Sequence, residues 1–163
     1  MRELRILAVF AFAALLFGCS SSKVRIVGEE PDPAKPTILI ALLRNSQTRF
    51  KAELVDLIRQ DFAGTYNVAV REVSKPEDLK GLDYDALVVM ETLKAWLLFN
   101  RGLKKFADLP DQSRTVYFVS SGDPGWTWKG RQDLKIVTGA TGGRRAAETY
   151  PELRAFLDGV LKR

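Results

Sequence analysis

The chain has 163 residues, of which 46% are apolar and 28% charged, with a formal net charge of +5. This composition fits one core-forming globular domain and excludes collagen-like, disordered and polytopic membrane proteins. The absence of histidine excludes Ser-His-Asp and Cys-His catalysis, and the single cysteine, Cys19, excludes an internal disulfide and a thiolate metal cage.

The first 18 residues have the pattern of a secretory signal peptide. Basic residues open the chain, and an unbroken run of 12 apolar residues extends from Ile6 to Phe17. This run is short for a membrane span, which needs about 20 apolar residues. Residues 16–19 (LFGC) resemble the lipobox of bacterial lipoproteins, in which the peptide before the cysteine is removed and the cysteine is lipidated. The resemblance implies that Cys19 is the lipidation site; the alternative is an incidental cysteine at the end of a core helix.

The lipobox resemblance implies a protein of the bacterial cell envelope, held at a membrane by its lipid. The residue after the cysteine is Ser20 rather than aspartate, which in enterobacterial lipoproteins favours the outer membrane, facing the periplasm. After signal peptide 1–18, residues 19–36 are the lipidated cysteine and a tether rich in proline and charge. A folded domain is expected at 37–163.

From residue 37 onward the pattern alternates between strand and helix. Apolar runs predict strands at 37–43, 66–73, 85–90, 115–120 and 134–137. Helical spacing predicts that the first helix turns one face inward, consisting of Phe50, Leu54, Leu57, Ile58 and Phe62. Its outward face is expected to hold Lys51, Glu53, Asp56 and Arg59. A second helical stripe contains Trp96, Phe99, Leu103 and Phe106.

The last part of the chain predicts one more helix. Residues 149–152 (TYPE) fit a capping box, which predicts a helix that begins after Thr149. Thirteen residues separate Ser120 from Leu134, whereas a parallel crossover needs about a dozen or more. The helix usual at this place is therefore truncated or replaced by a loop, and the orientation of the last strand stays open.

Alternating strands and helices favour a parallel sheet covered on both faces. Residues 83–89 (DYDALVV), 103–106 (LKKF) and 115–123 (TVYFVSSGD) resemble, in order and spacing, the third strand, the following helix and the fourth strand of flavodoxins. We therefore expect an α/β fold with a flavodoxin-like doubly wound parallel sheet of about five strands, in the order 2-1-3-4-5 and truncated after strand 4.

The flavodoxin resemblance implies a site for flavin mononucleotide (FMN) beyond the carboxyl ends of the strands. Hydroxyl groups and helix amides would hold the phosphate, and aromatic side chains would stack on the ring. The candidate cofactor residues are Asn45, Ser46, Thr48, Thr92, Trp96 and Trp126. The loop after the first strand lacks the family's glycine, and the family's aromatic pattern is not kept. The alternative is that the polar residues cap the first helix and the tryptophans are core or a local hydrophobic lid.

Two functions remain open at this point. The missing glycine favours a cofactor-free binding or assembly scaffold, and the alternative is an FMN-binding electron-transfer protein. No catalytic residue is assigned, although Glu91 and Asp123 fall near the ends of neighbouring strands, where paired carboxylates suit acid-base work or a divalent ion. The basic residues are scattered along the sequence, so their distribution does not indicate a nucleic-acid-binding surface. The expected partners are a membrane, through the lipid, and an envelope protein.

Overall fold

Five parallel strands form one sheet in the order β2-β1-β3-β4-β5. The computed structural model describes residues 32–44, 47–93, 101–123, 126–140 and 146–162. The strands are β1 (Thr37–Leu43), β2 (Asn67–Val73), β3 (Ala86–Thr92), β4 (Thr115–Ser121) and β5 (Lys135–Ala140). This is the flavodoxin-like α/β arrangement predicted from the sequence. Parallel pairing of β4 with β5 settles the orientation of the last strand.

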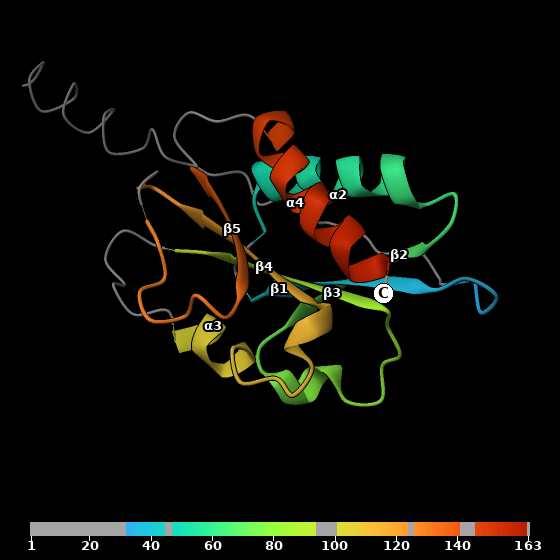
Figure 1. The fold of residues 1–163 in the computed structure, drawn as a ribbon, viewed down its shortest axis with the longest axis horizontal. Coiled ribbons are helices and arrows are strands. Elements are labelled where there is room, and N and C mark those ends of the chain that lie inside the picture. The colour runs from blue at the N-terminus through green and yellow to red at the C-terminus, as the bar shows by residue number, and fades with distance from the viewer. Residues whose placement is uncertain (1–31, 45–46, 94–100, 124–125, 141–145, 163) are drawn as a thin grey trace, which may run out of the picture.

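Helices cover both faces of the sheet (Figure 1). The helices α2 (Arg49–Phe62) and α4 (Ala146–Leu161) lie on one face. The helix α3 (Arg101–Phe106) and the short 3-10 helix η1 (Pro76–Leu79) lie on the other. Successive side chains of β4 enter the two cores in turn, so all seven residues of this strand are buried. Burial on both faces explains why the central strands appear in the sequence as continuous apolar runs.

The first helix, α2, begins at its N-cap Thr48, whose Oγ1 accepts a hydrogen bond from the backbone N–H of Lys51 at 3.3 Å. The predicted inward residues Leu54 and Ile58 are fully buried. The prediction that Lys51 faces solvent is wrong, because its side chain is 0% exposed. The side chain turns toward the carboxyl ends of the strands, where its amine bonds to Thr92.

The last helix starts earlier than the capping box predicts. Helix α4 already includes Ala146, so Thr149 is an interior helical residue and not an N-cap. Ala146 and Tyr150, one turn apart, both enter the core beneath α2 and α4. Burial of this extra turn outweighs the hydrogen bond that Pro151 removes inside the helix. The shift leaves the Thr149 Oγ1 buried and without a hydrogen-bond partner in the described part of the chain.

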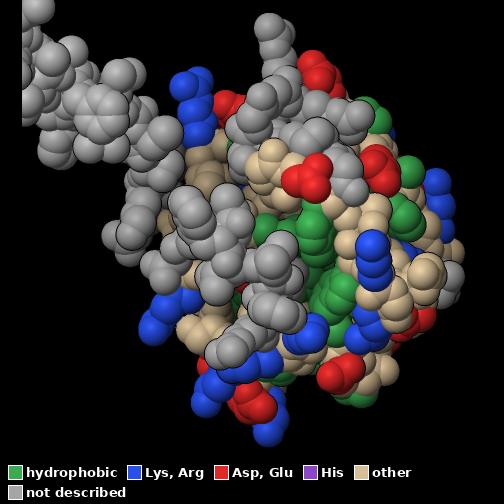
Figure 2. All heavy atoms as spheres, turned by 90° about the vertical axis from the view of Figure 1, so that its left-hand side faces the viewer, with side chains coloured by type: hydrophobic (Ala, Val, Ile, Leu, Met, Phe, Trp, Pro, Cys, Tyr) green, Lys and Arg blue, Asp and Glu red, His purple; other side chains and the backbone are tan. Residues whose placement is uncertain are grey.

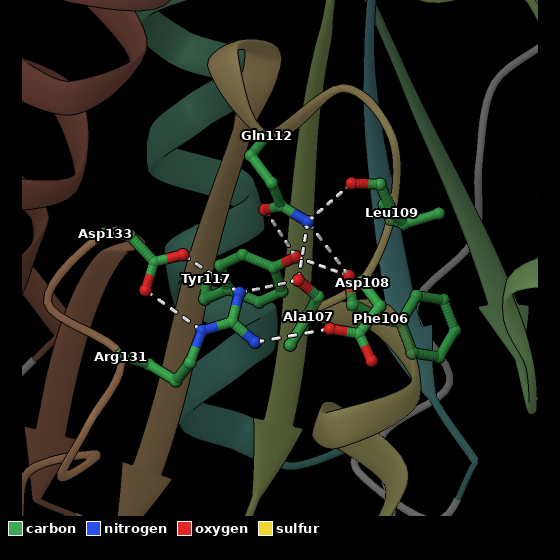
Figure 3. A network of polar contacts seen from close by, with 8 residues as sticks. All are labelled: Phe106, Ala107, Asp108, Leu109, Gln112, Tyr117, Arg131 and Asp133. Carbon is green, nitrogen blue, oxygen red and sulfur yellow. Dashed lines mark hydrogen bonds and ion pairs between the residues drawn. The ribbon is translucent and has the colours of Figure 1, made fainter.

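The predicted truncation after β4 is confirmed, since the described residues between β4 and β5 contain no helix. Trp126 and Trp128 pack there against the core on the α3 face. A polar network also joins this region to the end of α3 (Figure 3). We call it the Tyr117 network; its side chains are those of Gln112, Tyr117, Arg131 and Asp133.

The Tyr117 network supplies partners to backbone carbonyls that follow α3. The Gln112 Nε2 donates to the carbonyls of Ala107 and Leu109, each at 2.9 Å. The Tyr117 hydroxyl lies 2.6 Å from the carbonyl oxygen of Phe106 and 2.9 Å from Gln112 Oε1. Because the last carbonyls of a helix have no intrahelical partner, these contacts close the end of α3.

Arg131 ties the loop before β5 into the same network. Its Nη2 donates to the carbonyl of Ala107 at 2.8 Å, and its Nε and Nη2 each lie 3.0 Å from a carboxylate oxygen of Asp133. The guanidinium also lies 5.9 Å from the ring centroid of Trp128. One arginine therefore fastens the loop to α3 where a flavodoxin-like fold usually has a helix.

Candidate functional site

Charged and hydroxyl side chains meet at the carboxyl ends of β3 and β4, beside the first turn of α2. They are Lys51 from α2, Glu91 and Thr92 from β3, and Ser120 from β4. We call these four residues the Lys51 cluster. In doubly wound sheets ligands bind beyond the carboxyl ends, at the point where the strand order reverses. That point lies between β1 and β3 here, next to the cluster.

Figure 2 views the molecule from the side on which the strands end. A band of hydrophobic side chains occupies the middle of this face, and side chains of both charges surround it. The described residues of this face are therefore chemically mixed rather than strongly basic or acidic. Buried polar groups at such a face need hydrogen bonds to one another, because bulk water does not reach them and no large patch of opposite charge stabilises them.

A short chain of hydrogen bonds runs through the Lys51 cluster. The Lys51 Nζ donates to the Thr92 Oγ1 at 2.8 Å, and the Ser120 Oγ lies 2.9 Å from the same oxygen. The Ser120 Oγ is also 3.3 Å from the backbone carbonyl of Glu91. Lys51 and Ser120 are both 0% exposed. These contacts join α2 to two neighbouring strands at the edge of the sheet where the carboxyl ends of the strands lie.

The Glu91 carboxylate lies between β3 and the first turn of α3. The backbone N–H of Leu103 donates to it, whereas its Oε2 is buried with no hydrogen-bond partner among the described residues. A Cβ added to Gly102 would lie 2.9 Å from Glu91 Oε1 and 2.9 Å from Leu43 Cδ2. Only glycine at position 102 therefore lets the backbone of α3 approach the carboxylate this closely.

Burial shifts both ionisable groups of the cluster toward their neutral forms. Desolvation lowers the pKa of Lys51 to about 7, and the charge of Glu91 offsets part of this effect. Desolvation also raises the pKa of Glu91, against the Leu103 N–H and the charge of Lys51. The pair can therefore change its proton content near neutral pH. Among the described residues, no group of three or more His, Cys, Asp or Glu side chains is placed to hold a metal ion.

The predicted cofactor residues fall into three groups. Thr48 and Thr92 are brought together through Lys51, which bonds to both. Trp126 is half-buried and packs with the core on the α3 face. Asn45, Ser46 and Trp96 lie outside the described residues, as does Cys19.

Lys51 is not among the site residues that the sequence predicts. A lysine at an outward helical position is ordinarily solvated, and helical spacing does not reveal that the first turn of α2 overhangs the ends of the strands. The available signals were indirect: Lys51 follows the first strand closely, and Glu91 ends an apolar strand where a carboxylate is costly to bury. Glu91 was paired in the sequence with Asp123, whereas Lys51 is the charged group that acts on its pKa.

A hollow of about 720 Å³ opens at the opposite edge of the sheet, near the amino ends of β1 and β2. Its lining includes Leu39, Ala69, Leu82 and Asp83. It occupies the place where η1 and a loop, rather than a full helix, connect β2 to β3. The hollow and the Lys51 cluster are thus separate features of the molecule.

Comparison with known proteins adds little. No family model matches the chain, and no curated protein matches it. A similar solved structure is the crystal structure of the lysine decarboxylase LdcF of Francisella novicida, with 13% sequence identity and a TM-score of 0.47. The similarity covers 82% of this chain and 18% of that one. Within the described residues, no helix is both long enough and apolar enough to cross a membrane.

Proposed function

We propose that this chain is a lipid-anchored protein of the bacterial envelope whose flavodoxin-like domain is a cofactor-free binding or assembly scaffold. The anchor is proposed from Cys19, which directly follows the apolar run and Gly18. The outer membrane, facing the periplasm, is the proposed location. An envelope protein is the proposed partner, and no nucleic acid is expected.

The scaffold proposal is carried by the hydrogen bonds of two threonine hydroxyl groups near the point where the strand order reverses. The Thr48 Oγ1 caps α2, and the Thr92 Oγ1 accepts from Lys51 and lies beside the Ser120 hydroxyl. These two threonines are the described hydroxyl residues that the flavodoxin resemblance assigns to FMN. Both hydroxyl oxygens already accept internal hydrogen bonds, which fix the two side chains within the fold, so an FMN phosphate would have only their O–H donors to bind.

The cofactor state is tested with the full-length chain purified in detergent. We expect no flavin absorption bands, and no quenching of flavin fluorescence when FMN is titrated to about millimolar concentration, the weak limit of specific binding. Flavin that copurifies, or binding near micromolar, would contradict the cofactor-free scaffold and favour the FMN-binding alternative. In that case Thr48→Ala combined with Thr92→Ala should weaken binding about a hundredfold, at about 1.5 kcal/mol for each lost bond.

The anchor is tested separately. In the variant Cys19→Ser the precursor should stay unprocessed, with its apolar run still attached, and should lose its lipid label. Ser20→Ala is the matched control and should be processed as the original chain is. Lipid labelling of Cys19→Ser would exclude the lipobox assignment while leaving the scaffold proposal intact.

A further inference from the structure

We propose that the Lys51 cluster is a proton-controlled latch, closed above neutral pH, that holds the first turn of α2 against the carboxyl ends of β3 and β4. Proton uptake as the pH falls from the alkaline range to neutral places an ammonium ion where neither water nor a strong counter-charge supports it, and the first turn of α2 then opens. This regulation goes beyond the proposed scaffold role, and it does not depend on which partner or cofactor the domain takes.

The hydrogen bonds of the amine suit its neutral form. An ammonium group has three N–H donors, whereas the acceptor that bonds to Lys51 Nζ in the described part of the chain is the Thr92 Oγ1, at 2.8 Å. A neutral amine makes the same bond and leaves fewer donors unmet. Since the Lys51 side chain is 0% exposed, water does not replace the missing acceptors in the closed form.

The groups that face Lys51 offer it little charge. From α2 comes the neutral Thr48, from β4 the neutral Ser120, and from β3 the neutral Thr92 and the carboxyl group of Glu91. Glu91 is the charged group that acts on Lys51 among the described residues. Burial raises the pKa of the Glu91 carboxyl, which weakens the counter-charge that it offers, and its Oε2 has no hydrogen-bond partner within the described ranges. An ammonium at Lys51 is therefore supported by this one carboxyl group and by no other charged group among the described residues.

The first turn of α2 is the part that can yield. The bond from the Lys51 backbone N–H to the Thr48 cap is long, at 3.3 Å, and the first intrahelical bond joins the Ala52 N–H to the Thr48 carbonyl at 3.0 Å. Further along, Leu54 and Ile58 are fully buried and hold the rest of the helix. Local opening at a helix end costs much less than global unfolding, so unwinding one turn releases the ammonium to water.

The first experiment follows the side-chain carbon signals of lysine by NMR in the full-length chain, labelled with ¹³C-lysine. One lysine signal should titrate near pH 7 and be missing in Lys51→Met. The matched control Lys104→Met, which removes an exposed lysine of α3, should leave that signal in place. Glu91→Gln removes the supporting charge and should move the midpoint to lower pH. A Lys51 signal that stays constant between about pH 6 and pH 9 would overturn the proposal.

The second experiment measures amide hydrogen exchange at about pH 5.5 and about pH 8, corrected for intrinsic exchange rates. The protection factor of the Ala52 amide should be at least about tenfold lower at the acidic pH, because proton binding drives the opening. The Ala63 amide, which bonds to the Arg59 carbonyl at the other end of α2, is the internal control. In Lys51→Met the Ala52 difference should vanish. Equal protection of Ala52 at both pH values would exclude the latch even if Lys51 titrates near neutrality.

Discussion

The Lys51 cluster and the Tyr117 network are both polar groups that are partly buried against one sheet, yet they are built in opposite ways. The Tyr117 network joins neutral side chains to backbone carbonyls and turns its cation, the half-buried Arg131, toward the exposed carboxylate of Asp133. The Lys51 cluster instead places an amine beside a carboxyl group whose Oε2 has no hydrogen-bond partner among the described residues. The first arrangement has one stable state, whereas the second changes with its proton content.

The two regions also differ in what titration does to them. Burial raises the pKa of Tyr117 to about 12, so its hydroxyl keeps its proton throughout the ordinary pH range. Burial lowers the pKa of Lys51 to about 7, which brings its proton exchange into that range. The comparison teaches that burial alone does not decide the role of a polar cluster; the charge type and the supply of partners do.

The largest effects are expected in the apolar core that both polar regions share. Leu39 and Val88 lie on the adjacent strands β1 and β3 and belong to the cores on opposite faces of the sheet. Replacing either residue by alanine should lower the free energy of unfolding by about 2–4 kcal/mol, with Val88 at the low end. Urea denaturation of the full-length chain measures this loss. A loss below about 0.5 kcal/mol at both positions would contradict the burial of the two strands.

Within the Tyr117 network, Gln112→Ala should be clearly destabilising. The change removes the donor to the carbonyls of Ala107 and Leu109 and the acceptor beside the Tyr117 hydroxyl. Leaving such groups unpaired should cost about 2–3 kcal/mol in urea denaturation. The matched control Gln60→Ala, at an exposed position of α2, should change stability by less than about 0.5 kcal/mol. An equally small loss for Gln112→Ala would show that the network contributes nothing to stability.

In the Lys51 cluster the same kind of change should have the opposite sign. Lys51→Met keeps most of the side-chain volume and removes a buried ionisable group, so it should raise the free energy of unfolding by about 1–3 kcal/mol at pH 7. The Thr92 hydroxyl keeps its contact with Ser120. Lys104→Met, at an exposed position of α3, is the control. If Lys51→Met instead lowers the free energy of unfolding, the Lys51 cluster stabilises the fold as the Tyr117 network does, and the contrast between them is contradicted.

The strands of the sheet could be predicted because each is indicated by residues that follow one another in the chain. The run from Thr115 to Ser120 is short, apolar and rich in β-branched and aromatic residues, which favours a strand buried on both faces, and β4 is that strand. The flavodoxin-like order then followed from the alternation of strands and helices. Truncation after strand 4 followed from the short distance between Ser120 and Leu134.

The candidate site was harder to predict because it depends on contacts between distant segments. Lys51 occupies a polar position of an amphipathic helix, and spacing alone cannot tell a solvated lysine from one that bends over the end of a sheet. Its partner Thr92 is 41 residues away in the chain. The predicted start of α4 was wrong for a related reason. The capping pattern at Thr149 is local, whereas the helix begins earlier because Ala146 is buried in the core, and this burial is visible only in the folded structure.

The central claim, that folding holds the Lys51 amine out of water, is tested most directly by the pH dependence of stability. Because the pKa of Lys51 is about 7 in the folded chain and 10.5 in its ordinary state, the unfolded chain holds an extra proton between these values. Stability therefore rises with pH in this window, by up to about 1.4 kcal/mol per pH unit, and the penalty is complete below it. Urea denaturation of the original chain and of Lys51→Met at pH 7, 8 and 9 isolates this contribution. We expect the stability advantage of Lys51→Met to shrink steadily as the pH rises; an advantage that stays constant from pH 7 to 9 would contradict the account.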